Sequence, residues 1–192
     1  MDFYFHMRTN IEDQIKAHQS TVETLHSVMP MIESVANILI QAASQNQTIF
    51  WCGNGGSAAD AQHLAAELVG RFQRERRAVS SIALTANTSV ITAISNDYGF
   101  KTVFTRQLEA LSKPRDVLIA LSTSGQSDNV NRAVQFANEH NLQVVALTGK
   151  DGGELKTLTD QCIIVPSDVT ARIQEAHILI GHILCQLVED SL

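Results

Sequence analysis

Residues 116–127 read DVLIALSTSGQS: an unbroken apolar run ends in a loop of serine, threonine and glycine. Four similar runs are each followed by a polar or glycine-containing turn and a helix-like stretch; they are TIFWC at 48–52, SSIAL at 80–84, QVVALT at 143–148 and CIIVP at 162–166. Runs nearly continuous in Val, Ile and Leu are typical of strands buried on both faces. The alternation of such strands with helices predicts an α/β fold in which helices cover both faces of a parallel sheet.

The segment before the first strand, residues 8–46, carries apolar residues at helical spacing, beginning with Ile11 and Ile15. Pro30 fits the first turn of a helix, so we expect two helices that divide near this residue. No repeat or linker interrupts the 192 residues. We therefore expect a single domain, 1–192, with the N-terminal helices at 8–46 and the α/β core at 47–192.

Charge and composition exclude several classes of protein. The net charge is −6, and the one basic cluster, RFQRERR at 71–77, is short and contains a glutamate. We expect this cluster to be a solvated helix end with only Arg71 near a site, and we expect no direct nucleic-acid binding. His182 and Gln186 interrupt the longest apolar stretch, and the first ten residues are largely polar, so we expect neither a membrane span nor a signal peptide.

The three cysteines, Cys52, Cys162 and Cys185, share no disulfide-framework or zinc-finger spacing. Their odd number and isolation favour small core residues in a reducing compartment. We therefore expect a cytoplasmic protein.

Three of the predicted strands lead into loops that carry polar chemistry: CGNGGS at 52–57, LSTSGQS at 121–127 and TGKDGGE at 148–154. Ligands of parallel sheets bind beyond these strand ends. In the middle loop, four hydroxyls surround Gly125 directly before a helix; they belong to Ser122, Thr123, Ser124 and Ser127. Hydroxyls and backbone N–H groups at a helix start suit a phosphate. An ordinary capped turn explains these residues equally well, and no nucleotide-binding motif is present.

The loop CGNGGS leads into a helix that carries a histidine and a carboxylate. Ser57 and Asp60 have the spacing of a capping box, so we expect this helix to begin at Ser57. His63 and Glu67 are four residues apart and then share one face. They suit a divalent metal, or Glu67 suits the role of base beside a metal-held substrate. The alternative, a hydrogen-bonded pair on a solvated face, is favoured by this segment alone.

A second helix is expected over residues 171–188, ARIQEAHILIGHILCQLV, where polar residues interrupt an apolar run. At about 100° per residue, His177 lies about 60° from Gln174 on one side of the helix and His182 about 80° on the other. Periodicity therefore does not choose between the two histidines as a partner for His63.

This second helix is too apolar for the surface of a monomer. Its apolar residues form a stripe of Ile173, Ala176, Ile180, Leu184 and Leu187, and cover much of the remaining circumference with Ile178, Leu179, Ile183 and Cys185. A helix that is apolar nearly all round must be enclosed, so we expect an oligomer. Because the candidate ligands lie on two different helices, we also expect a neighbouring chain to complete or support each site.

The order CGNGGS, AQHLAAEL, SNDYGF, LSTSGQS, ALTGKDGGEL and ARIQEAHILIGHIL resembles the phosphoheptose isomerase family, whose members have a sugar-isomerase (SIS) domain. The resemblance covers nearly the whole chain. It implies a three-layer αβα sandwich with a five-stranded parallel sheet, and a homotetramer in which the N-terminal helices pack. It also implies conversion of D-sedoheptulose 7-phosphate to D-glycero-D-manno-heptose 7-phosphate, which feeds lipopolysaccharide core or related glycans.

The resemblance also implies the roles of particular residues. One zinc ion (Zn2+) per subunit is expected on His63, Glu67, Gln174 and His182, which favours His182 over His177. Glu67 is the expected base at carbon and His182 the expected acid at oxygen. The implied substrate contacts are Asn54, Gly55, Gly56, Ser57, Glu67, Arg71, Asn96, Asp97, Ser122, Thr123, Ser124, Ser127 and Gln174.

One departure from the family pattern supports a different function. Related enzymes often carry Asp before Arg-Ile-Gln, where this chain has Ala171. A similar non-catalytic tetramer, which binds the bacterial replication initiator protein, also reads Ala-Arg-Ile-Gln. The joint presence of Glu67 and His182 favours the enzyme, because a scaffold has no need of both.

Overall fold

The computed structural model describes residues 2–192, with side chains from Met7 onward; Met1, the first residue of the predicted domain, lies outside them. All five apolar runs form strands: β1 (Ile49–Cys52), β2 (Ser81–Ala83), β3 (Val117–Ser122), β4 (Gln143–Gly149) and β5 (Cys162–Val165). They make one parallel sheet in the order β2-β1-β3-β4-β5. The predicted parallel sheet is confirmed.

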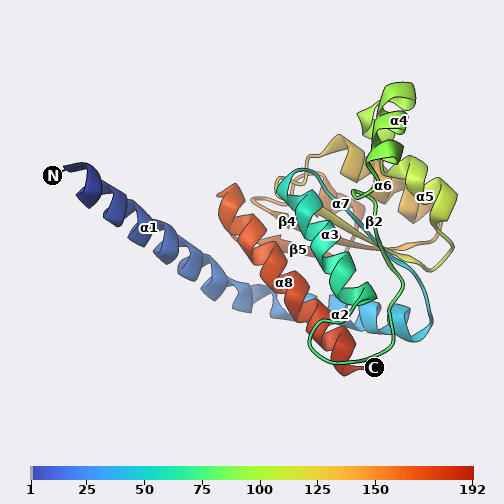
Figure 1. Cartoon of the computed structure of the whole chain (residues 1–192), viewed down its shortest axis with the longest axis horizontal. Helices are drawn as coiled ribbons and strands as arrows, with labels where there is room; N and C mark the ends of the chain where they lie inside the picture. Colours follow the sequence, from blue (N-terminus) through green and yellow to red (C-terminus); the bar gives the residue numbers. More distant parts are fainter. Residues whose placement is uncertain (1) are drawn as a thin grey trace.

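Helices cover both faces of this sheet (Figure 1). On one face, α2 (Met29–Ser44), α3 (Gly56–Val69) and α8 (Thr170–Asp190) share a core with alternate strand residues such as Trp51 and Ile119. On the other face, α5 (Thr105–Leu111), α6 (Asp128–Glu139) and α7 (Leu155–Leu158) share a second core with the intervening residues, such as Phe50 and Leu118. The three-layer αβα sandwich is therefore confirmed.

Two helices precede the sheet, as predicted. α1 (Asp2–Thr24) is followed by a short 3-10 helix (Leu25–Val28), and Pro30 lies in the first turn of α2. α1 extends away from the body of the molecule (Figure 1). Near its end it meets the start of α8, where His18 Nδ1 lies 2.7 Å from a carboxylate oxygen of Glu175. Among residues 2–192, no helix is both long enough and apolar enough to cross a membrane.

The buried face of α8 differs from the predicted stripe at one position. Leu187 is 37% exposed, whereas Gly181, Cys185 and Val188 are buried. The cause is the close approach of α3: a Cβ added at Gly181 would lie 2.4 Å from the Leu64 side chain. Since α3 packs on this side of α8, the buried face is turned toward Gly181 and Leu187 is left at the open edge.

Candidate functional site

The neighbouring helices α3 and α8 bring three predicted site residues together. His63 Nε2 lies 2.9 Å from His182 Nε2 and 3.3 Å from Glu67 Oε1. One ligand atom from each of His63, Glu67 and His182 lies within 4.8 Å of the others, and no other group of three or more His, Cys, Asp or Glu residues in the part of the chain described by the structure does so. We call these residues the His63 group.

The donors of the His63 group fit a divalent metal ion. Two imidazole nitrogens and one carboxylate oxygen are ligands typical of zinc, and three protein ligands leave a position for a substrate atom. The group is accessible, because the side chains of His63 and Glu67 are 51% and 23% exposed. The three residues of the group all come from α3 and α8 of one chain. Our expectation that a neighbouring chain completes or supports each site stays a prediction.

His177 has a different environment from His182. It is fully buried, and its Nε2–H donates to the carbonyl of Thr148 at 3.1 Å. Burial lowers the pKa of His177 to about 4, although the backbone hydrogen bond opposes the shift. Its other ring nitrogen is buried without a hydrogen-bond partner. A neutral histidine held inside the core is a structural residue, which leaves His182 as the partner of His63.

Gln174 lies near the start of α8, where this helix meets the start of α3. Its amide packs against Gly56, where an added Cβ would be 2.4 Å from Nε2. Gln174 precedes His182 by eight residues, which is about 12 Å along a helix axis. The structure therefore places Gln174 beside the CGNGGS loop, and its role as a fourth metal ligand stays a prediction.

The serine loop, residues 122–127, joins β3 to α6. Ser122 Oγ lies 3.0 Å from Ser127 Oγ, and Ser124 Oγ accepts from the N–H of Gln126 at 3.2 Å. Ser127 occupies the N-cap position of α6, but its side chain makes no capping hydrogen bond. The interpretation of this loop as an ordinary capped turn therefore loses its main support.

The third predicted loop supports the serine loop. Gly125 has a φ of 64°, and a Cβ there would lie 2.0 Å from the carbonyl oxygen of Gly152. The N–H of Leu155 donates to the carbonyl of Gly125 at 3.0 Å. Asn131 Nδ2 donates to Glu154 at 2.9 Å. Residues 149–155 thus hold the serine loop in place.

The first loop lies beside the serine loop, because β1 and β3 are neighbours in the sheet. Asn54 and Asn129, at the start of α6, exchange two side-chain hydrogen bonds of 2.8 and 2.9 Å. β2 lies on one side of β1, and β3, β4 and β5 lie on the other, so the chain changes direction across the sheet at β1 and β3. Sheets of α/β proteins bind ligands at such a switch point. The capping-box prediction was wrong: α3 begins at Gly56, its N-cap is Gly55, and no side chain caps it, because Ser57 is already inside the first turn and buried.

Asn96 and Asp97 lie on α4 (Thr88–Tyr98), which buries none of its residues. Their side chains are exposed, and Asn96 Nδ2 donates to Asp97 Oδ1 at 2.8 Å. Figure 1 shows α4 projecting from the body. The structure joins these two residues to each other, and their contact with a substrate stays a prediction.

The basic cluster at 71–77 is largely exposed, as predicted, but it lies beyond the end of a helix and the side chain of one of its arginines is buried. α3 ends at Val69, and the Arg76 side chain is only 5% exposed because it folds back onto the last turn of α3. Arg71 remains at the surface, 3.8 Å from Glu75.

Sequence reasoning missed three residues near the His63 group. The ring of Phe72 lies 5.5 Å from that of His182, and the N–H of Phe72 donates to Glu189 at 3.0 Å. Asp60, one turn before His63, has a buried oxygen without a hydrogen-bond partner; burial raises its pKa, and His63 opposes the shift. The signals were weak, because Glu189 is over a hundred residues from its partners and Asp60 resembled a cap.

Comparisons with known proteins identify the family of the chain. The family model for the SIS domain matches residues 12–149. The chain is 52% identical over 186 residues to a phosphoheptose isomerase from a Nitratiruptor species, covering 96% of this chain and 100% of that protein. It is 50% identical over 185 residues to a phosphoheptose isomerase from Helicobacter hepaticus, covering 96% and 94%.

A solved structure of phosphoheptose isomerase from Neisseria gonorrhoeae matches with a TM-score of 0.90 and 39% identity, covering 96% of this chain and 99% of that one. Another, from Francisella tularensis, matches with a TM-score of 0.89 and 36% identity, covering 99% and 100%. Fold, sequence and the residues gathered between α3 and α8 lead to one assignment: the chain belongs to the phosphoheptose isomerase family of SIS-domain proteins.

Proposed function

We propose that this protein is an aldose–ketose isomerase that converts D-sedoheptulose 7-phosphate to D-glycero-D-manno-heptose 7-phosphate in bacterial heptose biosynthesis, which supplies lipopolysaccharide core. The observation that carries the proposal is the His63 group, an accessible set of two histidines and a glutamate on α3 and α8. The sheet that these helices cover also carries the serine loop at the end of β3. The relatives that are 52% and 50% identical over nearly the full length are phosphoheptose isomerases.

The proposed cofactor is one zinc ion per subunit, held by His63, Glu67 and His182. A bound zinc ion supplies polarisation of the sugar carbonyl and stabilises negative charge on its oxygen. Gln174 is the proposed fourth ligand, or a contact to the substrate; its position against Gly56 favours the second role.

Glu67 and His182 carry the proposed proton transfers. Glu67 removes the proton from the carbon beside the carbonyl and returns it to the neighbouring carbon, so that ketose becomes aldose through an enediol. His182 moves protons at the two oxygens. Glu67 Oε1 faces His63 at 3.3 Å, which leaves the second carboxylate oxygen for the carbon proton.

The proposed phosphate site is the serine loop with the start of α6, a helix of 12 residues. The hydroxyls of Ser122, Thr123, Ser124 and Ser127 and the positive end of α6 are suited to bind an anion. Further proposed contacts to the sugar are Asn54, Gly55, Gly56, Ser57, Arg71, Asn96 and Asp97.

The proposed assembly is a homotetramer. Met7, Ile11 and Ile15 recur every four residues on α1 and are 43%, 53% and 54% exposed. An apolar cavity of about 410 Å³ lies where the end of α1 and α2 meet α8, and its lining includes the exposed Ile183 and Leu187. Burial of these surfaces between chains favours assembly.

The proposed location is the cytoplasm, since all three cysteines are free thiols, as a reducing compartment maintains them. The alternative function, a non-catalytic tetramer that binds the replication initiator protein, is not favoured. The relatives most similar in sequence named above are isomerases, and the His63 group provides a reactive set that a scaffold does not need.

Incubation of the purified protein with D-sedoheptulose 7-phosphate tests the proposal. We expect an isomeric aldose phosphate of unchanged mass, detected by its anomeric proton signal in NMR spectra. Retention of the ketose alone, with metal present and the protein folded, would contradict the proposed activity.

A further inference from the structure

The chain segment after α3, residues 70–76, is fastened to the end of α8 by a buried carboxylate. Glu189 is 2% exposed and accepts hydrogen bonds from three successive backbone N–H groups, those of Phe72 at 3.0 Å, Gln73 at 2.8 Å and Arg74 at 2.9 Å. Successive backbone N–H groups that converge on an anion form a strong binding arrangement. Here the anion is part of the protein, so the segment is held to α8.

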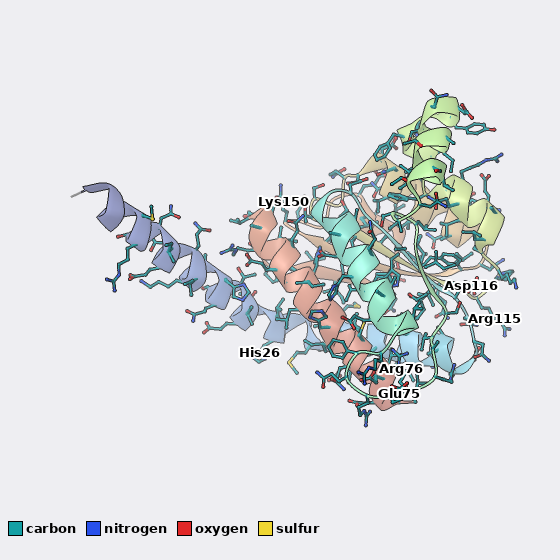
Figure 2. All side chains as sticks on the ribbon, in the orientation of Figure 1. His26, Glu75, Arg76, Arg115, Asp116 and Lys150 are labelled. Carbon is teal, nitrogen blue, oxygen red and sulfur yellow. The ribbon has the colours of Figure 1, made fainter. Side chains whose placement is uncertain are left out.

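Arg76 connects this carboxylate to α3. Its side chain is 5% exposed, and Nε lies 3.6 Å from Glu189 Oε1. The guanidinium donates to the carbonyl of Glu67 at 2.7 Å and to that of Gly70 at 2.8 Å. These carbonyls belong to the end of α3, where the helix leaves its last acceptors without internal partners. Figure 2 shows Arg76 beside the C-terminal part of α8.

Phe72 connects the same segment to His182. Its N–H is one of the three donors to Glu189, and its ring lies 5.5 Å from the His182 ring at an interplanar angle of 33°. Phe72 also packs against the core between the sheet and α8. Glu189 therefore holds the backbone of Phe72, and the ring of Phe72 lies beside the imidazole of His182.

We propose that Glu189 and Arg76 are positioning residues for the His63 group: they fix the segment that holds Phe72 against His182 and the turn of α3 that carries Glu67. The inference rests on the proposed metal-dependent function. Groups that orient metal ligands without touching the metal typically contribute about 10–100-fold in metal affinity or activity. Arg76 contacts only the backbone carbonyl of Glu67 and not its carboxylate. Glu189 and Arg76 therefore act on the position of the His63 group and take no part in proton transfer.

Glu189→Gln tests the proposal, with Asp190→Asn as the matched control, because Asp190 is the next residue but forms its ion pair with Arg74 at the surface. We expect Glu189→Gln to weaken Co2+ binding to the metal-free protein about 10–100-fold, measured by calorimetry. Turnover should fall while KM for the sugar phosphate changes less than about twofold, since no contact joins Glu189 to the serine loop. Asp190→Asn should match the wild type in both.

Phe72→Leu is the second variant, because it leaves Glu189, Arg76 and all three backbone hydrogen bonds in place. We expect it to lower Co2+ affinity and turnover, and Phe72→Tyr, which keeps the ring, to restore both. Wild-type Co2+ affinity in Phe72→Leu, or in folded Glu189→Gln, would overturn the proposal. A wild-type protein that binds Co2+ but does not isomerise the sugar phosphate would overturn the proposed function, and the affinities would still decide the role of Glu189.

Discussion

Two helices that carry predicted site residues, α8 and α4, differ in how much of each helix is buried within the chain. α8 buries about half of its residues, and α3 packs against it closely enough that Gly181 has no room for a side chain. α4 buries none: its last residue, Tyr98, is 56% exposed, and Phe100 just after the helix is 55% exposed. The comparison indicates that contacts within one chain bring the His63 group together, whereas α4 has few contacts within the chain that would fix Asn96 and Asp97.

The largest expected effect is on turnover, from a substitution in the His63 group between α3 and α8. Glu67→Gln keeps the shape of the side chain but removes the proposed base, and general-base removal typically costs about 10²–10⁴ in rate. We therefore expect turnover to fall at least about a hundred-fold while the circular dichroism spectrum is unchanged. Glu139→Gln, at the exposed end of α6, is the matched control and should keep full activity. Near-normal turnover in Glu67→Gln would remove Glu67 from the mechanism.

The second prediction concerns the pH dependence of stability that arises from His177, which is buried on α8. Its pKa is lowered from 6.5 to about 4, so between these values the unfolded chain binds a proton that the folded chain does not. Stability present above pH 6.5 is therefore lost as the pH falls toward 4, by an amount on the order of 3 kcal/mol. Denaturant unfolding at a series of pH values measures this loss.

His177→Gln should remove most of that pH dependence, while His26→Gln, at an exposed position, should keep it. Equal pH dependence in the wild type and His177→Gln would show that His177 titrates normally and is not held neutral in the core.

The third prediction concerns the serine loop. Ser124→Ala removes one hydroxyl proposed to bind phosphate in the ground and transition states alike, so KM should rise about tenfold with turnover little changed. Ser44→Ala, at an exposed helix end, is the control. Unchanged apparent affinity in Ser124→Ala would return this loop to the interpretation as a simple turn.

The smallest expected effect on stability comes from a substitution on α4, which buries none of its residues. Asp97→Asn should change the free energy of unfolding by less than about 0.5 kcal/mol, because α4 buries nothing that depends on it. KM should nevertheless rise if Asp97 contacts the sugar. A decrease of about 3 kcal/mol in the free energy of unfolding of Asp97→Asn, as large as the loss expected from protonation of His177, would contradict the difference drawn between α4 and α8.

Much of the fold was predictable because each strand is a nearly continuous apolar run that ends at a turn. All five runs became strands, and Pro30 marks the second helix. The start of α3 was missed by one residue, since Ser57 and Asp60 fit a cap while Gly55 takes that position. Leu187 was misplaced because helical periodicity does not include the direction from which α3 approaches.

The site was only partly predictable from the residues themselves. Spacing identified His63 and Glu67 as neighbours, but the choice of His182 over His177 depends on which face of α8 meets α3, and only the family resemblance indicated it. Glu189 and Arg76 could not be found this way, because their contact joins residues far apart in the sequence. The composition of the basic cluster predicts a solvated surface, and it gives no sign that the Arg76 side chain is buried against α3.

The central claim is that the His63 group is a metal site required for isomerisation, and a metal titration tests it most directly. Metal-free protein is titrated with Zn2+ while D-sedoheptulose 7-phosphate turnover and the melting temperature are followed, with His182→Ala as the control. We predict that turnover rises to a plateau at one metal per chain, that the melting temperature rises with it, and that His182→Ala shows neither change. Full turnover in the metal-free protein, or equal metal stabilisation of His182→Ala, would contradict the claim.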